Sequence, residues 1–231
     1  MEKIDLHIHT NFSDGDFSPE QIVDIAVKRG LKAIAITDHD TADGISRAIN
    51  HADGRIEVIP GIEITCNEKS QGFFNVHVIG LFINQKNKEI SKLRYNPKRR
   101  SDNRGQDTVG ISEAIRIIKK AGGLAFLAHP GVYGRRDSIE LIGLFLKMGG
   151  DGIEIIYPYD KVFPDNYDKK RTNETIKSFI KIAKEKNILQ TGGSDFHGRI
   201  RDISLGEIDV DYDVLEAIKK KKLKILLKVQ P

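Results

Sequence analysis

The chain has 231 residues, 39% of them hydrophobic, with 37 basic and 33 acidic side chains and a formal net charge of +4. No apolar run approaches the roughly 20 residues that cross a bilayer. The N-terminus begins without a charged-then-apolar leader, and the single cysteine, Cys66, excludes an internal disulfide. We therefore expect one domain over residues 1–231 in the cytoplasm, with no membrane and no obligatory protein partner.

Short apolar strands alternate with amphipathic helices along most of the chain. The first helix has the clearest boundaries, since Ser18-Pro19-Glu20-Gln21 is a capping-box start and Gly30 ends the helix. Apolar spacing predicts further helices over 43–50, 111–121, 137–148, 173–186 and 213–221. The predicted strands are 2–6, 31–36, 57–59, 75–83, 124–128, 152–156, one that begins at Ile188, and a final strand over 224–229.

The predicted strands are continuously apolar, which is typical of a parallel sheet buried on both faces. About seven strand–helix units favour a closed α/β barrel over an open sheet. No Gly-rich nucleotide fingerprint follows a strand, which argues against a dinucleotide-binding fold. Residues 84–110 show no clear period and are predicted to leave the barrel rim as a short basic excursion. Its basic residues, from Lys86 to Arg104, would either attract phosphate or nucleic acid or form a solvated loop.

Six of the seven histidines follow an apolar run that ends in polar residues. His7 and His9 lie two residues apart on a predicted strand, so they project from the same face. An isolated His-x-His pair is equally well explained by histidines hydrogen-bonded at a strand end. In an α/β barrel, however, the C-terminal strand ends meet at one rim. We therefore expect convergence of His7, His9, His39, Glu63, His77, His129, Asp195 and His197, whereas His51 is expected to be a solvated loop residue.

This set of side chains predicts a metal centre. Nitrogen and oxygen ligands without thiolates suit zinc, manganese or iron, and their number implies two or three divalent ions. Glu63 is the natural bridge between two ions, while Cys66 is expected to be a buried apolar side chain. Paired ions can supply a hydroxide nucleophile, so a serine nucleophile is not required, and no G-x-S-x-G occurs. The sequence therefore predicts metal-assisted hydrolysis.

Seven stretches match, in order, the motifs of one family. They are Asp5-Leu6-His7-Ile8-His9-Thr10, Ser13-Asp14-Gly15, Ile36-Thr37-Asp38-His39-Asp40-Thr41, Gly61-Ile62-Glu63, His77, Ala128-His129-Pro130 and Gly193-Ser194-Asp195-Phe196-His197-Gly198. These closely resemble the motifs of PHP-domain (polymerase and histidinol phosphatase) proteins. The resemblance implies a distorted (β/α)7, TIM-like barrel with a trinuclear metal site for phosphoester hydrolysis. It also implies one ion held by His7, His9, Glu63 and Asp195, a second by Glu63, His77 and His129, and a third by Asp14, His39 and His197.

The match is most similar to a stand-alone branch that includes 3′,5′-nucleotide bisphosphate phosphatases and related exoribonucleases. Asp14 stands where some other branches have histidine, and an oxygen ligand shifts the preference of that site toward manganese or magnesium. Residues 84–110 are shorter than the helical insertion that this branch usually carries. Arg135 and Arg199 follow two of the motifs and are predicted to bind substrate phosphate, because a guanidinium makes bidentate contacts with phosphate. The alternative is that both are ordinary rim arginines.

The predicted reaction is attack of a metal-bridging hydroxide on a phosphomonoester, with His197 or a water at the third site assisting the leaving group. The expected substrate is a small phosphoester, such as a nucleotide 3′,5′-bisphosphate. The alternatives are 3′–5′ exonuclease action on short RNA or DNA, a histidinol-phosphatase-like activity, and a metal-binding module without turnover. An amidohydrolase is disfavoured, because no lysine can be assigned to the carboxylated position that such barrels commonly use.

Overall fold

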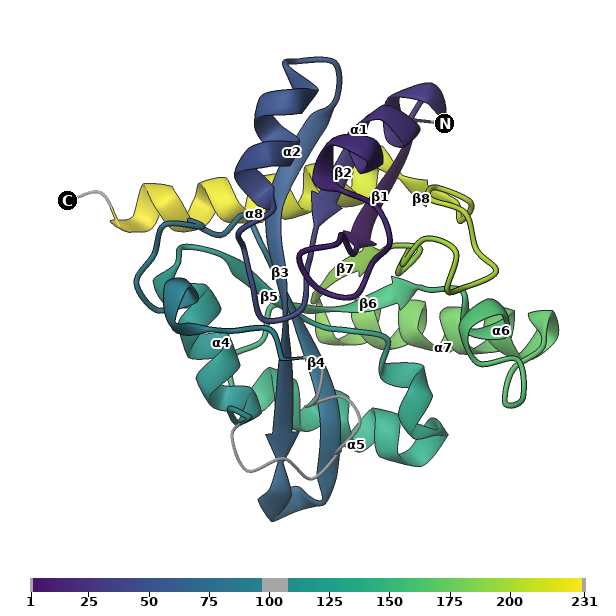
Figure 1. Cartoon of the computed structure of the whole chain (residues 1–231). Coiled ribbons are helices and arrows are strands. Elements are labelled where there is room, and N and C mark those ends of the chain that lie inside the picture. The colour runs from purple at the N-terminus through teal and green to yellow at the C-terminus, as the bar shows by residue number, and fades with distance from the viewer. Residues whose placement is uncertain (1, 97–107, 230–231) are drawn as a thin grey trace.

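The computed structural model describes residues 2–96 and 108–229, apart from the side chains of Arg135 and Val229. Its strands form one sheet in the order β7-β6-β5-β4-β3-β2-β1-β8 (Figure 1). Their bounds are β1 Lys3–Ile8, β2 Ala33–Ile36, β3 Glu57–Glu68, β4 Phe73–Leu81, β5 Leu124–Leu127, β6 Gly152–Ile156, β7 Leu189–Gly192 and β8 Val210–Asp211. The α-helices are α1 Pro19–Lys28, α2 Ile45–Ala52, α4 Ile111–Lys120, α5 Arg135–Lys147, α6 Tyr159–Val162, α7 Lys169–Lys186 and α8 Tyr212–Val229.

The sheet is mixed, so the expectation of a wholly parallel sheet is wrong. β1, β2 and β3 run parallel to one another, as do β5, β6 and β7. β4 is antiparallel to both of its neighbours, and β8 is antiparallel to β1. The reason for β4 is its connection: only the single turn η1, Lys69–Gln71, and its flanking residues join β3 to β4. A link this short permits an antiparallel pair, whereas a parallel pair needs a long crossover.

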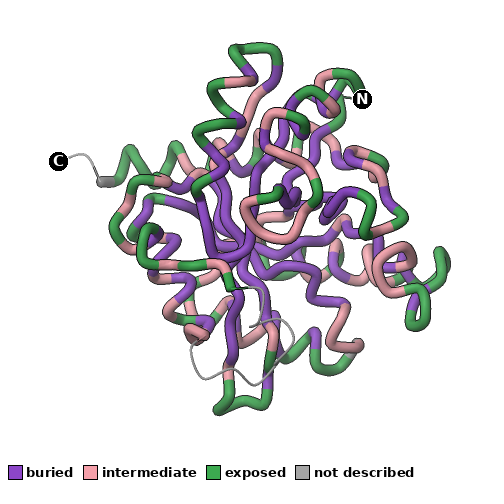
Figure 2. Tube along the Cα trace, in the orientation of Figure 1, coloured by how far each residue is buried: buried purple, intermediate pink, exposed green. Residues whose placement is uncertain are grey.

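The sheet curls until its β7 end meets β1, which gives the nearly closed barrel that the sequence predicts. The backbone N–H of His9 donates to the carbonyl of Phe196 at 3.0 Å, across the gap between the two ends. Gly193 lies against His7 so closely that an added Cβ would be 2.4 Å from the His7 backbone nitrogen. A side chain at position 193 would therefore open the seam. Most of the buried residues follow the strands, and the helices surround them (Figure 2).

The core has two layers. The inner layer fills the barrel and includes Ile4, Leu6 and Phe126, and Leu215 of α8 packs against it. The outer layer lies between the sheet and the surrounding helices, and it includes Ile8. Leu6 and Ile8 are two residues apart yet belong to opposite layers, because the register of β1 shifts between Asp5 and Ile8. A bulge of this kind turns the following side chains to the other face, so it aims the end of β1 into the barrel.

Most of the predicted helices are confirmed, with their ends shifted by a few residues. The capping box forms, since the Ser18 hydroxyl accepts from the Gln21 N–H and the Gln21 side chain accepts from the Ser18 N–H. The predicted strand 224–229 is wrong, because α8 continues through it without a glycine or proline to stop the helix. His51 lies in α2 rather than in a loop, with an ion pair of 2.9 Å to Asp24.

The predicted basic excursion, 84–110, falls partly outside the described residues, which omit 97–107. Its described part contains the short turn η2, Ile90–Lys92, with Ile90 buried. Of the helices that the structure describes, none is long and apolar enough to cross a membrane.

Candidate metal centre

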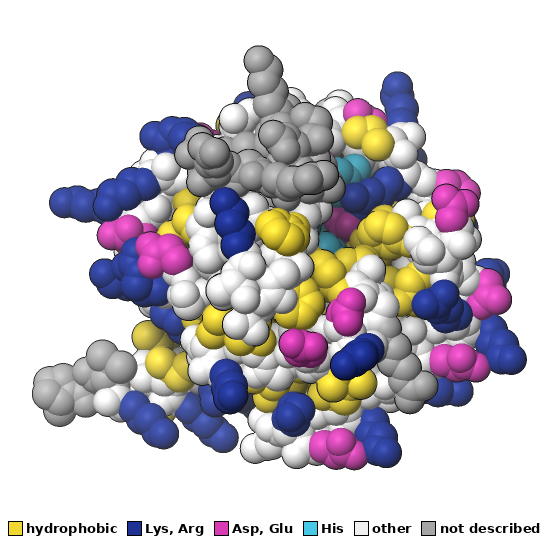
Figure 3. Space-filling view, turned by 90° about the horizontal axis from the view of Figure 1, so that it is seen from below, with side chains coloured by type: hydrophobic (Ala, Val, Ile, Leu, Met, Phe, Trp, Pro, Cys, Tyr) yellow, Lys and Arg dark blue, Asp and Glu magenta, His cyan; other side chains and the backbone are white. Residues whose placement is uncertain are grey.

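The nine predicted metal ligands lie together where β1, β2, β5 and β7 end. They come from seven separate parts of the chain: His7 with His9, Asp14, His39, Glu63, His77, His129, and Asp195 with His197. All except Asp14, which is half-buried, are buried. Histidine and acidic side chains are visible at the bottom of a hollow in the surface (Figure 3). The convergence predicted from the sequence is therefore present.

Glu63 and His77 differ from the other seven in their position. In the sequence both follow an apolar run, as residues at a strand end would, but in the structure they lie within β3 and β4. β3 and β4 are the longest strands and continue past the rim as a hairpin. His77 pairs with Thr65, two residues beyond Glu63, so the two ligands are diagonal neighbours on one face. The hairpin register, rather than a strand end, sets their separation.

The first ligand set surrounds one point with nearly equal spacings. The Nε2 atoms of His7 and His9 are 3.1 Å apart. Each lies 3.2–3.3 Å from Glu63 Oε2 and 3.2–3.4 Å from Asp195 Oδ1. A tetrahedral ion with bonds of about 2.0–2.1 Å has ligand–ligand edges of about 3.3–3.4 Å. The four atoms therefore have the spacing of a tetrahedral metal site.

The second set uses the other oxygen of the same carboxylate. Glu63 Oε1 lies 3.3 Å from His77 Nδ1 and 3.4 Å from His129 Nε2, and the two nitrogens are 3.2 Å apart. These are again tetrahedral edges, and the three atoms leave the fourth vertex of the tetrahedron open. Since Oε2 belongs to the first set and Oε1 to the second, Glu63 has the geometry of a bridge between two ions.

The third set is wider. Ligand atoms of Asp14, His39 and His197, together with one from His9, all lie within 4.8 Å of one another. The shortest contact joins His197 Nε2 to Asp14 Oδ2 at 3.0 Å. The His9 ring stacks on that of His197 at 4.1 Å, with its Nε2 in the first set and its Nδ1 facing Asp14 at 3.5 Å. His9 thus lies between the first and third sets, a role that the sequence does not indicate.

The hydrogen bonding of the cluster is incomplete in the way that a metal centre requires. Buried polar atoms are normally hydrogen-bonded. Here several side-chain atoms of the cluster make no hydrogen bond to any described residue: His9 Nδ1, His39 Nδ1, Glu63 Oε1, His77 Nε2, His129 Nδ1 and His197 Nε2. Four of them, Glu63 Oε1 and the nitrogens of His9, His39 and His197, face the proposed ligand sets. Divalent cations would satisfy these lone pairs, so the donor set and its spacing fit metal ions.

Burial and charge act in opposite directions on the ionisation of the cluster. Burial lowers the pKa of His7, but the charges of Glu154, Glu63 and Asp195 outweigh it and raise that pKa well above its usual value. Burial would raise the pKa of Glu63, but the neighbouring histidines hold it well below its usual value. His197 follows burial, which lowers its pKa to about 2, with the charge of His9 adding to the effect. The cluster therefore keeps carboxylates ionised and holds some imidazoles neutral, as metal binding requires.

Glu154 supports the ligands, and sequence reasoning missed it. It is fully buried in β6, with Oε1 3.0 Å from His7 Nδ1 and Oε2 accepting the His129 backbone N–H at 2.8 Å. One carboxylate thus orients residues of two ligand sets, which is the usual task of an outer partner of a metal-bound histidine. The available signal was a lone glutamate inside the apolar run Gly152–Ile156.

Arg201 is a second residue that the sequence analysis did not select. It forms an ion pair with Asp195, whose carboxylate also accepts from the Tyr157 hydroxyl at 2.7 Å. A cavity of about 310 Å³ opens over the cluster, and Arg201 lies in its wall. The rest of the wall combines cluster residues with apolar and aromatic side chains, among them Phe74, Tyr133 and Phe163. The cavity therefore places the Arg201 guanidinium and the candidate metal ligands opposite an apolar wall.

The two arginines predicted to bind phosphate have different outcomes. The side chain of Arg135 is not among those that the structure describes. Arg199 lies outside the cavity over the cluster and lines a separate groove beside α1. Its role in binding substrate phosphate stays a prediction, while the geometry favours Arg201 as the guanidinium nearest the metal ligands.

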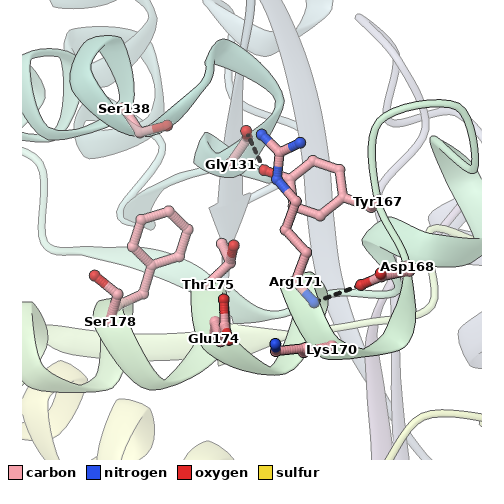
Figure 4. A pocket seen from close by; sticks show the side chains of 10 residues that line it. Gly131, Ser138, Tyr167, Asp168, Lys170, Arg171, Glu174, Thr175 and Ser178 are labelled. Atoms are coloured by element: carbon pink, nitrogen blue, oxygen red, sulfur yellow. Dashed lines mark hydrogen bonds between the residues drawn. The ribbon is translucent and has the colours of Figure 1, made fainter.

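The turn η3, Pro130–Tyr133, contributes Val132 and Tyr133 to the cavity over the cluster and Gly131 to a second cavity of about 630 Å³. Figure 4 shows the second cavity and the residues that line it. The N–H of Gly131 donates to the Tyr159 hydroxyl at 3.0 Å, and its carbonyl accepts from Tyr167 at 2.7 Å. Arg171 stacks over the Tyr167 ring at 4.7 Å. These contacts fix the turn that follows His129, and so position that ligand from behind.

Comparisons with known proteins agree with this description. A family profile described as PHP domain matches residues 5–188. The chain is 26% identical to a 5′–3′ exoribonuclease of Haemophilus influenzae, over 89% of this chain and 94% of that protein. It is 25% identical to a 3′,5′-nucleoside bisphosphate phosphatase of Chromobacterium violaceum, over 85% and 88% of the two chains. A solved structure from Bifidobacterium adolescentis has the same fold, with a TM-score of 0.74 and 22% identity over 95% of this chain and 96% of that one.

Proposed function

The chain belongs to the PHP domain family, and from this premise we propose that it is a metal-dependent phosphoesterase. One observation carries the proposal: the two oxygens of Glu63 each belong to a ligand set with tetrahedral spacing. The named activities of the two relatives, exoribonuclease and bisphosphate phosphatase, both hydrolyse phosphate esters. Two or three divalent ions, zinc, manganese or iron with magnesium as a further candidate, are proposed to bind here.

The proposed ligand sets are those implied by the sequence motifs. One ion would be held by His7, His9, Glu63 and Asp195, a second by Glu63, His77 and His129, and a third by Asp14, His39 and His197. When bound, such ions polarise phosphoryl oxygens and lower the pKa of bound water, so that a nucleophile exists at neutral pH.

The protein groups around the ions orient the substrate. Arg201, in the wall of the cavity, can pair with a phosphoryl oxygen while its other side holds Asp195. His197 Nδ1 lies 2.8 Å from the Asp195 carbonyl, to which it can only donate, so Nε2 carries the lone pair. A single lone pair serves either a metal or a proton. We assign it to the third ion, which leaves a water to protonate the leaving group.

The apolar side of the cavity, with Phe74, Tyr133 and Phe163, suits a planar organic group attached to the phosphate. We therefore favour a nucleotide phosphomonoester, such as a 3′,5′-bisphosphate, as the substrate. Exonuclease action on short RNA or DNA is the second candidate. The sequence-based alternative specified 3′–5′ polarity, whereas the relative is named for 5′–3′ polarity, and we adopt the polarity of the relative.

The test is phosphate release from adenosine 3′,5′-bisphosphate with added manganese, beside AMP, histidinol phosphate and a short RNA. We expect turnover of the nucleotide substrates, and Glu63→Gln should abolish it and lower the metal content. Glu68→Gln, on the same strand but outside the ligand sets, is the control and should retain both. Full activity of Glu63→Gln would refute the bridging role. Bound metal without turnover of any phosphoester would instead indicate a metal-binding module.

A further inference from the structure

Residues 196–201 contribute some side chains to the candidate metal centre and its cavity and others to a separate groove. His197 and Arg201 face the cluster and its cavity, whereas Phe196, Gly198 and Arg199 line a groove of about 560 Å³ between α1 and residues 203–205. Consecutive residues therefore form the wall between the two spaces. A molecule that leaves the metal cavity over this loop would meet the groove next.

The groove has an apolar floor. Phe17 and Phe196 lie nearly parallel, with ring centres 5.8 Å apart and planes inclined by 15°. Ile203 and Leu205, both buried, continue the floor. The partly exposed Phe17 and Ile25 present this apolar surface to the groove, and the buried Phe196, Ile203 and Leu205 support it from beneath. Apolar surface that includes an aromatic ring can pack against a nucleobase without requiring a particular base.

The rim of the groove carries basic side chains that form no ion pair with a described acidic side chain. Lys28 and Arg29, at the C-terminal end of α1, and Arg199 are exposed, and no ion pair joins any of them to a described acidic side chain. Among the residues that line the groove there is no aspartate or glutamate. Two carboxylates bind the backbone beside the groove without lining it: Asp16 accepts the N–H of Arg199 at 2.7 Å, and Glu207 accepts the N–H of Ser204 at 2.8 Å. Three cations beside an apolar floor suit a ligand that alternates phosphates with planar groups.

We propose that this groove, between α1 and residues 198–205, binds a single-stranded nucleic acid whose terminal nucleotide lies in the metal cavity. The proposal rests on the phosphoesterase function proposed above and extends it from mononucleotides to oligonucleotide substrates. An acidic peptide would use the three cations but would have no need of the Phe17 ring beside them. Phosphates of a strand would pair with the rim cations, and the bases would lie on the floor.

The experiment compares a short 5′-phosphorylated RNA with adenosine 3′,5′-bisphosphate as substrates of the manganese-loaded protein. In the variant Lys28→Glu/Arg29→Glu, kcat/KM for RNA should fall at least about tenfold, while bisphosphate turnover stays at the wild-type value. The dependence of RNA affinity on log salt should become shallower by about 0.7 per lost phosphate contact. Lys28→Gln/Arg29→Gln should show the same direction with a smaller effect, and it avoids acidic charge at the helix end. Lys220→Glu/Lys221→Glu, exposed on α8, makes the same net-charge change elsewhere and should leave RNA kinetics unchanged.

Two outcomes would overturn the proposal that the groove binds nucleic acid. One is equal loss of RNA turnover in the α8 control, which would indicate a general charge effect. The other is wild-type RNA kinetics and salt dependence in both α1 variants. Binding of fluorescently labelled RNA provides a readout that does not depend on hydrolysis. If the wild-type protein hydrolyses neither substrate yet the α1 variants weaken RNA binding, the phosphoesterase proposal fails and the groove stands.

Discussion

Replacing Glu154 by glutamine tests whether one buried carboxylate supports two ligand sets. Glutamine has the same shape, but only one of its two terminal atoms accepts a hydrogen bond. The Glu154 carboxylate accepts two hydrogen bonds, one from His7 Nδ1 at 3.0 Å and one from the backbone N–H of His129 at 2.8 Å. One donor must therefore lose its partner in a fully buried site. A buried hydrogen bond to a charged group contributes about 1.5–3 kcal/mol, which corresponds to about 10–100-fold in metal affinity. Outer-partner substitutions in metal sites typically have the same range.

The assay is competition with a chelator, which reports the affinity of each variant for manganese or zinc, followed by activity at saturating metal. We expect weaker metal binding by Glu154→Gln and partial recovery of activity when metal is in excess. Glu185→Gln, at an exposed position of α7, is the matched control. Wild-type metal affinity in Glu154→Gln would refute the reasoning, because it would show that neither hydrogen bond matters for the ligands.

Three further perturbations follow from the site. Arg201→Ala should raise KM for phosphoesters about tenfold or more while metal stays bound, and unchanged steady-state kinetics would remove this arginine from the substrate site. Burial lowers the pKa of His7, but the charges of its carboxylate neighbours have the larger effect and raise that pKa. Below the raised pKa the metal-free protein therefore carries a proton on His7, and a binding metal ion must displace it. Below that raised pKa, metal affinity should increase about tenfold per pH unit, and calorimetry in buffers of different ionisation enthalpy should show proton release; zero release would contradict the shift. Gly131→Ala would place a Cβ 2.7 Å from the Tyr159 ring and should destabilise the fold by about 1–3 kcal/mol; Gly143→Ala, with open space around its Cβ, is the control and should melt at or above the wild-type temperature.

The residues that the sequence could predict are those whose chemistry is visible locally. Histidines and carboxylates at the ends of apolar runs identified the metal cluster, because the ends of barrel strands meet at one rim. The Ser18 cap was equally local, since its partner is three residues away. In each of these cases the role of the residue in the fold can be recognised from its immediate neighbours in the sequence.

The residues that the sequence could not predict depend on distant contacts. Glu154 acts on His7, 147 residues away in the chain, and no spacing rule connects them. Arg201 and Arg199 have the same side chain two residues apart, yet they face different cavities because the loop turns between them. The C-terminal end of α8 resembles a strand in sequence because Ile225-Leu226-Leu227 is a short apolar run, which does not distinguish a strand from a helix. Tertiary packing overrides such weak local patterns.

The long β3–β4 hairpin holds the candidate metal ligands and part of the cavity wall at different positions along its length. Glu63 and His77 lie in the half of the hairpin nearer the barrel, where backbone pairing with the neighbouring strand ends fixes their positions. Its half away from the barrel carries Phe74 in the wall of the cavity over the cluster and ends in the exposed turn Lys69–Gln71. Insertions or substitutions at that tip would alter which molecules are accepted without moving a catalytic ligand. The hairpin is thus a natural place for selectivity to diverge among descendants of this fold, and the first place to vary it by engineering.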